Sequence, residues 1–274
     1  MVRGLDDRTV GAPLTRWIAI AAGAAYLVPL MGERVAPDNP RWTHPGWLFG
    51  GLGLHLVALL IDVALWGALP LSSMRFGLGA LALWVIIGWA VLHRRPQMES
   101  LRRLLVGLAL VLLGIAQVAP DSGGSADLSS PWFLAHVALI LIGLGGLAVS
   151  FTLSVLWLLV RRRLKLKKLR GISRLPTLDT LDRLNYQAMA LGFVSLTAGM
   201  AVGGMWAATH PEAALGADIT IWGTLLLWCW YAVGLHTRLV SGWRGRLAAV
   251  FGVGGFVGLG AMVTVAGLVL QGWH

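Results

Sequence analysis

The chain alternates between long apolar stretches and short polar loops. Eight apolar stretches cover about residues 16–32, 47–69, 74–92, 103–119, 132–160, 188–208, 219–237 and 247–271. Most have about the length that a helix needs to cross a hydrocarbon core of ~30 Å, and 132–160 is long enough to extend beyond it. None alternates apolar and polar residues as the strands of a membrane barrel do. The pattern predicts an all-α polytopic membrane helix bundle of about eight transmembrane helices, organised as a single membrane domain over 1–274.

Composition and charge support a membrane protein and set its expected orientation. Hydrophobic residues make up 57% of the chain and charged residues only 12%, whereas a soluble domain carries about a quarter charged residues. The net charge of +10 comes from short basic clusters between the spans, not from one folded face, so nucleic acid is not an expected partner. Lysine and arginine fill the loops after the third, fifth and seventh spans and are missing after the fourth and sixth. The positive-inside rule then predicts that both termini lie outside. The expected location is a bacterial inner (plasma) membrane.

Cysteine and glycine usage narrow the chemistry. Cys229 is the single cysteine, so the chain has no internal disulfide, no C-x-x-C redox pair and no covalent C-x-x-C-H haem site. Three G-x-x-x-G steps, at 46/50, 199/203 and 254/258, are expected to be close helix contacts in lipid. The first residues lack the plan of a cleaved signal peptide.

Four histidines and one aspartate lie in or at the ends of the apolar stretches: His55, His136, His236, His274 and Asp62. An ionisable residue inside a membrane is a functional hypothesis by default, because its burial costs free energy. Histidines at similar depth on different helices are what a haem iron with two imidazole ligands requires. The alternatives are packed core histidines and interfacial anchors. For Asp62 a solvated position near the end of its span is favoured over pairing with Arg75.

The stretch from residue 181 to 246 resembles the cytochrome c assembly family of CcsA- and CcmC-type membrane proteins. The family pattern L-D-x-L-x-Y, G-F-x-x-L-T-x-G, W-A, L-H-T-R and G-W-R-G is matched by Leu181-Asp182 with Tyr186, Gly192-Phe193 through Gly199, Trp206-Ala207, Leu235 to Arg238 and Gly242 to Gly245. Trp228 and Tyr231 also correspond. The specific resemblance covers about 130–274.

The chain departs from the family in its tryptophan-rich WWD loop. Pro211, Leu215 and Ala217 stand at tryptophan positions, and only Asp218 takes the place of the motif's aspartate. The pattern is therefore closer to a reduced branch of YpjD- and HemX-like proteins. Since that loop presents haem in the family, delivery of haem to a client is not expected here.

The resemblance implies a site for haem b with histidines on the iron. The expected iron ligands are an outer pair, His136 with His274, and an inner pair, His236 with His55; Trp206, Trp228 and Asp218 would line the cofactor. The implied role is haem handling or cytochrome c-type biogenesis by an assembly factor, not a conventional enzyme. Expected partners are membrane lipid and other cytochrome c maturation proteins. An accessory or regulatory protein of the same fold without haem delivery remains an alternative, as does a small-molecule or ion transporter.

Overall fold

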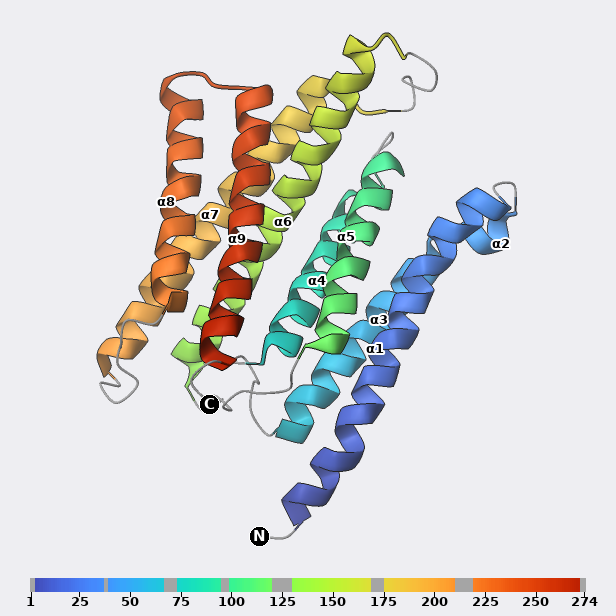
Figure 1. Ribbon diagram of the computed structural model, residues 1–274, viewed down its shortest axis with the longest axis vertical. Helices are drawn as coiled ribbons and strands as arrows, with labels where there is room; N and C mark the ends of the chain where they lie inside the picture. The colour runs from blue at the N-terminus through green and yellow to red at the C-terminus, as the bar shows by residue number, and fades with distance from the viewer. Residues whose placement is uncertain are drawn as a thin grey trace. The chain divides into compact units, whose positions relative to one another are not determined.

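The computed structural model describes residues 3–36, 39–66, 73–94, 99–119, 130–168, 175–209 and 219–271, and these residues form helices and a few turns, without a strand (Figure 1). The side chains of 3–13, 66, 99, 219–220 and 263–271 lie outside that description. The helices are α1 Arg3–Val35, α2 Pro40–Thr43, α3 Gly46–Trp66, α4 Met74–Leu92, α5 Glu99–Val118, α6 Pro131–Lys165, α7 Leu178–Thr209, α8 Ile219–Val240 and α9 Arg246–Gln271.

Six stretches of the described chain are long and apolar enough to cross a membrane. They lie in α1, α2 with α3, α4, α5, α6 and α7, and α8 and α9 add helices of 22 and 26 residues. The prediction of a polytopic, all-α membrane bundle is therefore confirmed. The long sixth helix is confirmed too, because its 35 residues span about 52 Å at a rise of 1.5 Å per residue.

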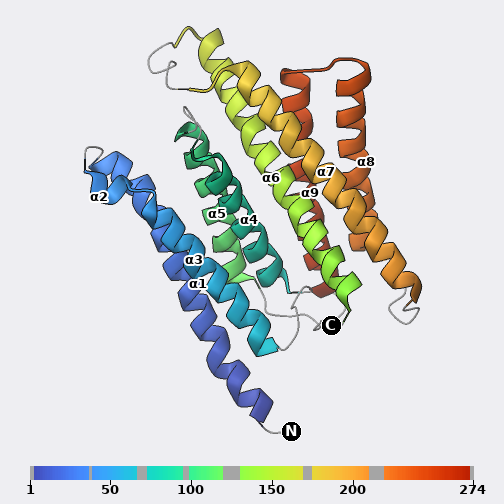
Figure 2. The ribbon, with the colours of Figure 1, turned by 180° about the vertical axis from the view of Figure 1, so that it is seen from behind.

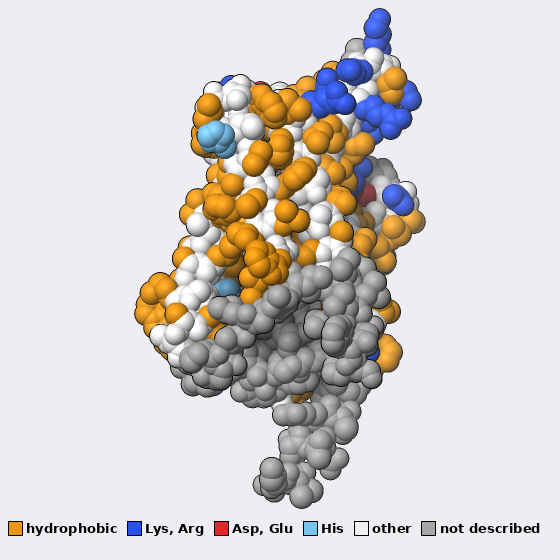
Figure 3. All heavy atoms as spheres, turned by 60° about the vertical axis from the view of Figure 1, so that its left-hand side comes forward, with side chains coloured by type: hydrophobic (Ala, Val, Ile, Leu, Met, Phe, Trp, Pro, Cys, Tyr) orange, Lys and Arg blue, Asp and Glu red, His pale blue; other side chains and the backbone are white. Residues whose placement is uncertain are grey.

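Local sequence sets the helix ends that matter for the site. Ser130 caps α6, its hydroxyl accepting from Phe133 N at 3.4 Å, and Pro131 follows in the first turn, where its missing N–H costs nothing. The last turn of α6 is basic, and Lys167 ends it in the left-handed region at φ 53°. Figure 3 shows lysine and arginine gathered at one end of a largely hydrophobic face. The exposed basic residues at the end of α6 are Arg162, Arg163, Lys165, Lys167 and Lys168.

The chain divides into two compact units. Unit 1 comprises Met1–Arg94 and Arg102–Ser129, and unit 2 comprises Arg95–Leu101 and Ser130–His274. In unit 1, α1 packs along α3, and α3 contacts α4. Tyr26 and Leu48 are fully buried there. The single membrane domain expected from the sequence stays a prediction.

Unit 2 is built on the pairing of α6 with α7, which run side by side (Figure 2). Their backbones approach closely at Gly143 and Gly192, where a Cβ on Gly192 would lie 2.9 Å from Gly143 O. Small residues permit this contact in lipid, where van der Waals packing drives helix association. α9 packs on α6, and α8 packs on α9 and α7. The buried core of this unit is formed by Leu147, Met189, Leu196, Leu227, Tyr231, Leu235 and Leu259.

Candidate functional site

His136 is the sequence-predicted ligand whose geometry best suits a metal. It lies in the second turn of α6, half-buried, and its Nδ1 is 2.7 Å from Gly199 O on α7. Because a carbonyl oxygen only accepts, Nδ1 carries the proton and Nε2 keeps its lone pair. No described residue hydrogen-bonds to Nε2. A histidine held through Nδ1 with a free Nε2 is the arrangement found in most imidazole-metal sites.

Glycines of α7 make room for this imidazole. A Cβ on Gly203 would lie 2.4 Å from His136 Nδ1, and one on Gly199 would lie 2.9 Å from Ile140 Cδ1. The G-x-x-x-G step at 199/203 is thus a close helix contact, as predicted, and it also accommodates the His136 ring. Phe133 lies beside the site, with ring centroids 6.2 Å from His136 and 5.0 Å from Trp206.

Trp228 holds α8 against α7 near the level of Gly199. Its Nε1 donates to Thr197 Oγ1 at 2.8 Å, and its ring stacks on Phe193 at 5.4 Å. This hydrogen bond fixes the indole in an interhelical contact. Trp228 therefore places an aromatic side chain between α7 and α8, and Trp206 contacts Phe133, whose ring lies near His136.

A polar clamp ties α7 to the end of α8. Arg238 donates from both terminal nitrogens to the two carboxylate oxygens of Asp182, at 3.1 and 2.7 Å. Gly245 N donates to Asp182 Oδ1 at 2.9 Å, and the guanidinium lies 4.7 Å above the Tyr186 ring. Both charged side chains are 12% exposed. Two-point pairing of arginine with a carboxylate is strong and directional.

The clamp explains why distant motif residues belong together. L-D-x-L-x-Y supplies Asp182 and Tyr186, H-T-R supplies Arg238, and G-W-R-G supplies Gly245. Gly242 and Gly245 have φ of 65° and 67°, a conformation that residues with a Cβ rarely adopt. A Cβ on Gly245 would also lie 2.9 Å from the Trp157 ring. Asp182 was not among the site residues predicted from sequence, although its charge at the head of an apolar stretch was a usable signal.

His236 precedes the clamp by two residues and is exposed. Asp182, which binds the end of α8, and Gly199, which binds His136, are 17 residues apart on α7, or about 26 Å at the helical rise. His136 and His236 therefore lie at opposite ends of unit 2 and do not share a metal.

His55 is buried in unit 1, at 1% exposure. Its Nδ1 lies 3.2 Å from the Tyr26 hydroxyl of α1, and its Nε2 has no hydrogen-bond partner among the described residues. Gly79 of α4 faces this nitrogen, since a Cβ there would lie 3.9 Å away. His55 and His236 belong to different units, so their pairing stays a prediction.

The sequence-based prediction that Asp62 is solvated is wrong. The carboxylate is 3% exposed and accepts from Arg75 Nη2 at 2.7 Å. The alternative partner named from sequence, Arg75 at the start of α4, is confirmed. Pairing compensates the cost of burying both charges between α3 and α4 of unit 1.

Several residues named from sequence lie outside the described residues: Asp218, His274, Pro211, Leu215 and Ala217. Within the described part of the chain, no three histidine, cysteine, aspartate or glutamate side chains gather into a metal site.

Fold and site together define a polytopic helical membrane protein in which a histidine anchored through Nδ1 lies beside aromatic side chains. The chain belongs to the cytochrome C assembly protein family, whose model matches residues 71–274. The match begins well before 130, so it includes α4 and α5 as well as the stretch that carried the resemblance.

The relatives are cytochrome c biogenesis proteins CcsA. The protein of Parasynechococcus marenigrum (strain WH8102) is 33% identical over 186 residues, covering 68% of this chain and 54% of the relative. That of Chlamydomonas reinhardtii is 31% identical over 147 residues, covering 54% and 41%. That of Prochlorococcus marinus (strain MIT 9301) is 26% identical over 255 residues, covering 80% and 82%. The chain thus spans about half the length of the first two relatives.

Proposed function

We propose that this protein handles haem in cytochrome c biogenesis and holds b-type haem through His136. The observation that carries the proposal is the His136 imidazole, anchored through Nδ1 to Gly199 O at 2.7 Å with Nε2 unengaged by the described residues. The names of the CcsA relatives, cytochrome c biogenesis proteins, support the same process.

Each residue near His136 has a distinct task in this proposal. Gly199 O fixes the tautomer and increases the basicity of Nε2 through the Nδ1–H hydrogen bond. Gly203 leaves the volume that the ring needs. Phe133 and Trp206 supply apolar, aromatic surface for a flat ligand. When bound, haem would supply an iron that accepts an imidazole ligand, and His136 would hold it through Nε2.

The remaining ligands of the proposal follow the family pattern. His274 is the proposed second ligand on the outer side. His236 and His55 are the proposed inner ligands, and the Asp182–Arg238 clamp sets the position of the α8 turn that carries His236. Asp218 is proposed to contact the cofactor's polar edge.

The proposed location is the bacterial inner membrane with both termini outside, and the proposed partners are lipid and other maturation proteins. The basic end of α6 would then lie on the cytoplasmic side.

A second candidate function is that of an accessory protein of the same fold that does not deliver haem. It is favoured by Pro211, Leu215 and Ala217, which stand where the family has loop tryptophans. Without these rings the loop lacks stacking surface for a porphyrin. The protein would then bind haem without presenting it to a client.

The test is a haemin titration of the purified protein, followed at the Soret band. His136→Ala should weaken binding, whereas His93→Ala should not. His93 is a matched control because its Nδ1 also lies 2.6 Å from a carbonyl oxygen, Ala90 O, while its ring packs against Trp89 and Phe49 within unit 1. Equal binding by the two variants would refute the role of His136.

A further inference from the structure

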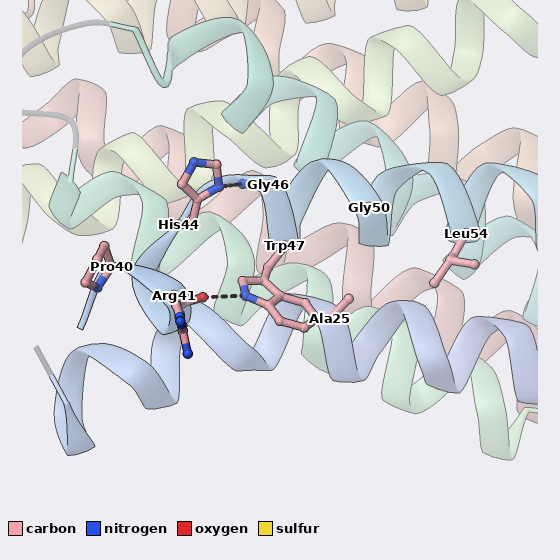
Figure 4. Close-up of a pocket in the computed structure, with 8 residues that line it drawn as sticks. All are labelled: Ala25, Pro40, Arg41, His44, Gly46, Trp47, Gly50 and Leu54. Atoms are coloured by element: carbon pink, nitrogen blue, oxygen red, sulfur yellow. Dashed lines mark hydrogen bonds between the residues drawn. The ribbon is translucent and has the colours of Figure 1, made fainter.

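A cavity of about 760 Å³ opens on unit 1 where α1 and α3 meet beside α2. It is lined by Ala25, Pro40, Arg41, His44, Gly46, Trp47, Gly50 and Leu54 (Figure 4). Its volume falls in the range of about 300–1,000 Å³ that holds small-molecule ligands. None of these residues belongs to the proposed haem site.

The apolar part of the cavity exists because Gly50 carries no side chain. Nothing lies within 4 Å of where a Cβ on Gly50 would be, whereas a Cβ on the neighbouring Gly51 would lie 2.6 Å from the Tyr26 ring. The G-x-x-x-G step at 46/50 is therefore not the close helix contact expected from the sequence. Ala25 of α1 and Leu54 of α3 line the hollow further along. From Trp47 to Leu54 it follows α3 for about 10 Å at the helical rise.

The other end of the cavity is polar and positively charged. The Arg41 side chain is exposed and makes no hydrogen bond or ion pair with the described residues, while its backbone is fixed. Its N–H donates to Asn39 Oδ1 at 3.0 Å, and its carbonyl accepts from Trp47 Nε1 at 2.8 Å. In Figure 4, Arg41 and Trp47 lie on the side of α3 that faces α1, and the His44 ring lies on the opposite side.

No acidic side chain neutralises this end among the described residues. The lining contains no aspartate or glutamate. Glu33, near the end of α1, pairs with Arg102 and with Arg103, the latter at 3.1 Å. Arg34 is also exposed, but it does not line the cavity. Within the described part of the chain, the cavity therefore joins a guanidinium without an acidic partner to an apolar lane.

We propose that this cavity is a binding site for one anionic glycerophospholipid. Arg41 binds the phosphate, since a guanidinium offers paired donors that match phosphate oxygens. The first part of an acyl chain lies along Ala25, Gly50 and Leu54. Two membrane-crossing stretches, Leu14–Val35 and Pro40–Leu65, end and begin at this corner, and Trp47 stands where interfacial tryptophans are found. A phosphate at Arg41 and an acyl chain along Gly50 and Leu54 would therefore have the depth and the direction of a lipid in the bilayer.

The experiment is native mass spectrometry of the full-length protein in detergent, titrated with phosphatidylglycerol or phosphatidylcholine. The unsubstituted protein should retain one phosphatidylglycerol in preference to phosphatidylcholine. Arg41→Gln should weaken retention of phosphatidylglycerol about tenfold, the scale of one lost charge-assisted contact. Arg34→Gln removes the same charge outside the lining and should leave retention unchanged.

A second pair of variants tests the apolar lane. Gly50→Leu fills the hollow and should abolish selective retention, whereas Gly53→Leu should not. Both glycines have open space at the Cβ position, and only Gly50 lines the cavity. Size-exclusion profiles establish that each variant is folded. If a leucine variant aggregates, the comparison of Arg41→Gln with Arg34→Gln decides the proposal. Equal retention of both lipids, or equal behaviour of Arg41→Gln and Arg34→Gln, would overturn the proposal.

Discussion

Replacing Asp182 by alanine should destabilise unit 2 markedly, because that carboxylate holds the end of α8 and the following turn. The substitution removes three hydrogen bonds, two from Arg238 and one from Gly245 N. It also leaves the guanidinium, 12% exposed, without its counter-charge. Breaking a buried pair by removing one partner costs about 3–5 kcal/mol. Some solvent reaches this pair, so a loss of about 2–4 kcal/mol is expected.

The assay is equilibrium unfolding of purified variants in mixed detergent and SDS micelles, with Asp179→Ala as the matched control. Asp179 is exposed in the first turn of α7, where its interaction with the helix dipole contributes at most about 1 kcal/mol. A double-mutant cycle with Arg238→Ala should give a coupling of about 1 kcal/mol or more. A coupling near zero, or an Asp182→Ala loss no larger than that of Asp179→Ala, would refute the clamp.

Three further outcomes are expected. Gly203→Ala should weaken haem binding about 10–100-fold, because its Cβ would fall 2.4 Å from His136 Nδ1. Gly204→Ala should leave binding unchanged, because a Cβ there meets open space. Equal haem affinities of the two variants would contradict this prediction. A reporter fused to the C-terminus should be active only outside the cytoplasm, following the basic loops, and cytoplasmic activity would reverse the topology. In a strain that lacks its own CcsA-type protein, this chain should not restore c-type cytochromes, as scored by covalent haem staining. The reason is that Pro211, Leu215 and Ala217 replace stacking tryptophans. Robust restoration would show that those tryptophans are dispensable.

The helices themselves could be predicted from sequence, because membrane-spanning length and apolarity are local properties. The long α6 followed from residues 132–160, and in the structure it starts one residue earlier, at Pro131 after the cap Ser130. Burial of a particular side chain is not local. Asp62 was expected in solvent, yet it is covered because α4 packs beside α3 and brings Arg75 to it.

Identical motifs also acquire different roles through tertiary packing. Gly199 and Gly203 meet α6 and make room for His136, whereas Gly50, in the same spacing, faces an open cavity. Which face of a helix meets a neighbour is decided by the other helices, so the spacing alone could not separate these cases. Asp182 and Arg238, 56 residues apart, could be joined only by the family motif or by the structure.

The central claim is that this protein holds haem through His136. The most direct measurement is the visible absorption spectrum of the protein purified from haem-sufficient cells, oxidised and then reduced, for the unsubstituted chain and for His136→Ala. The account predicts a low-spin spectrum typical of two histidine ligands, and loss of haem or conversion to a high-spin spectrum in the variant. A protein that carries no haem and binds none on reconstitution, or a spectrum unchanged by His136→Ala, would contradict it.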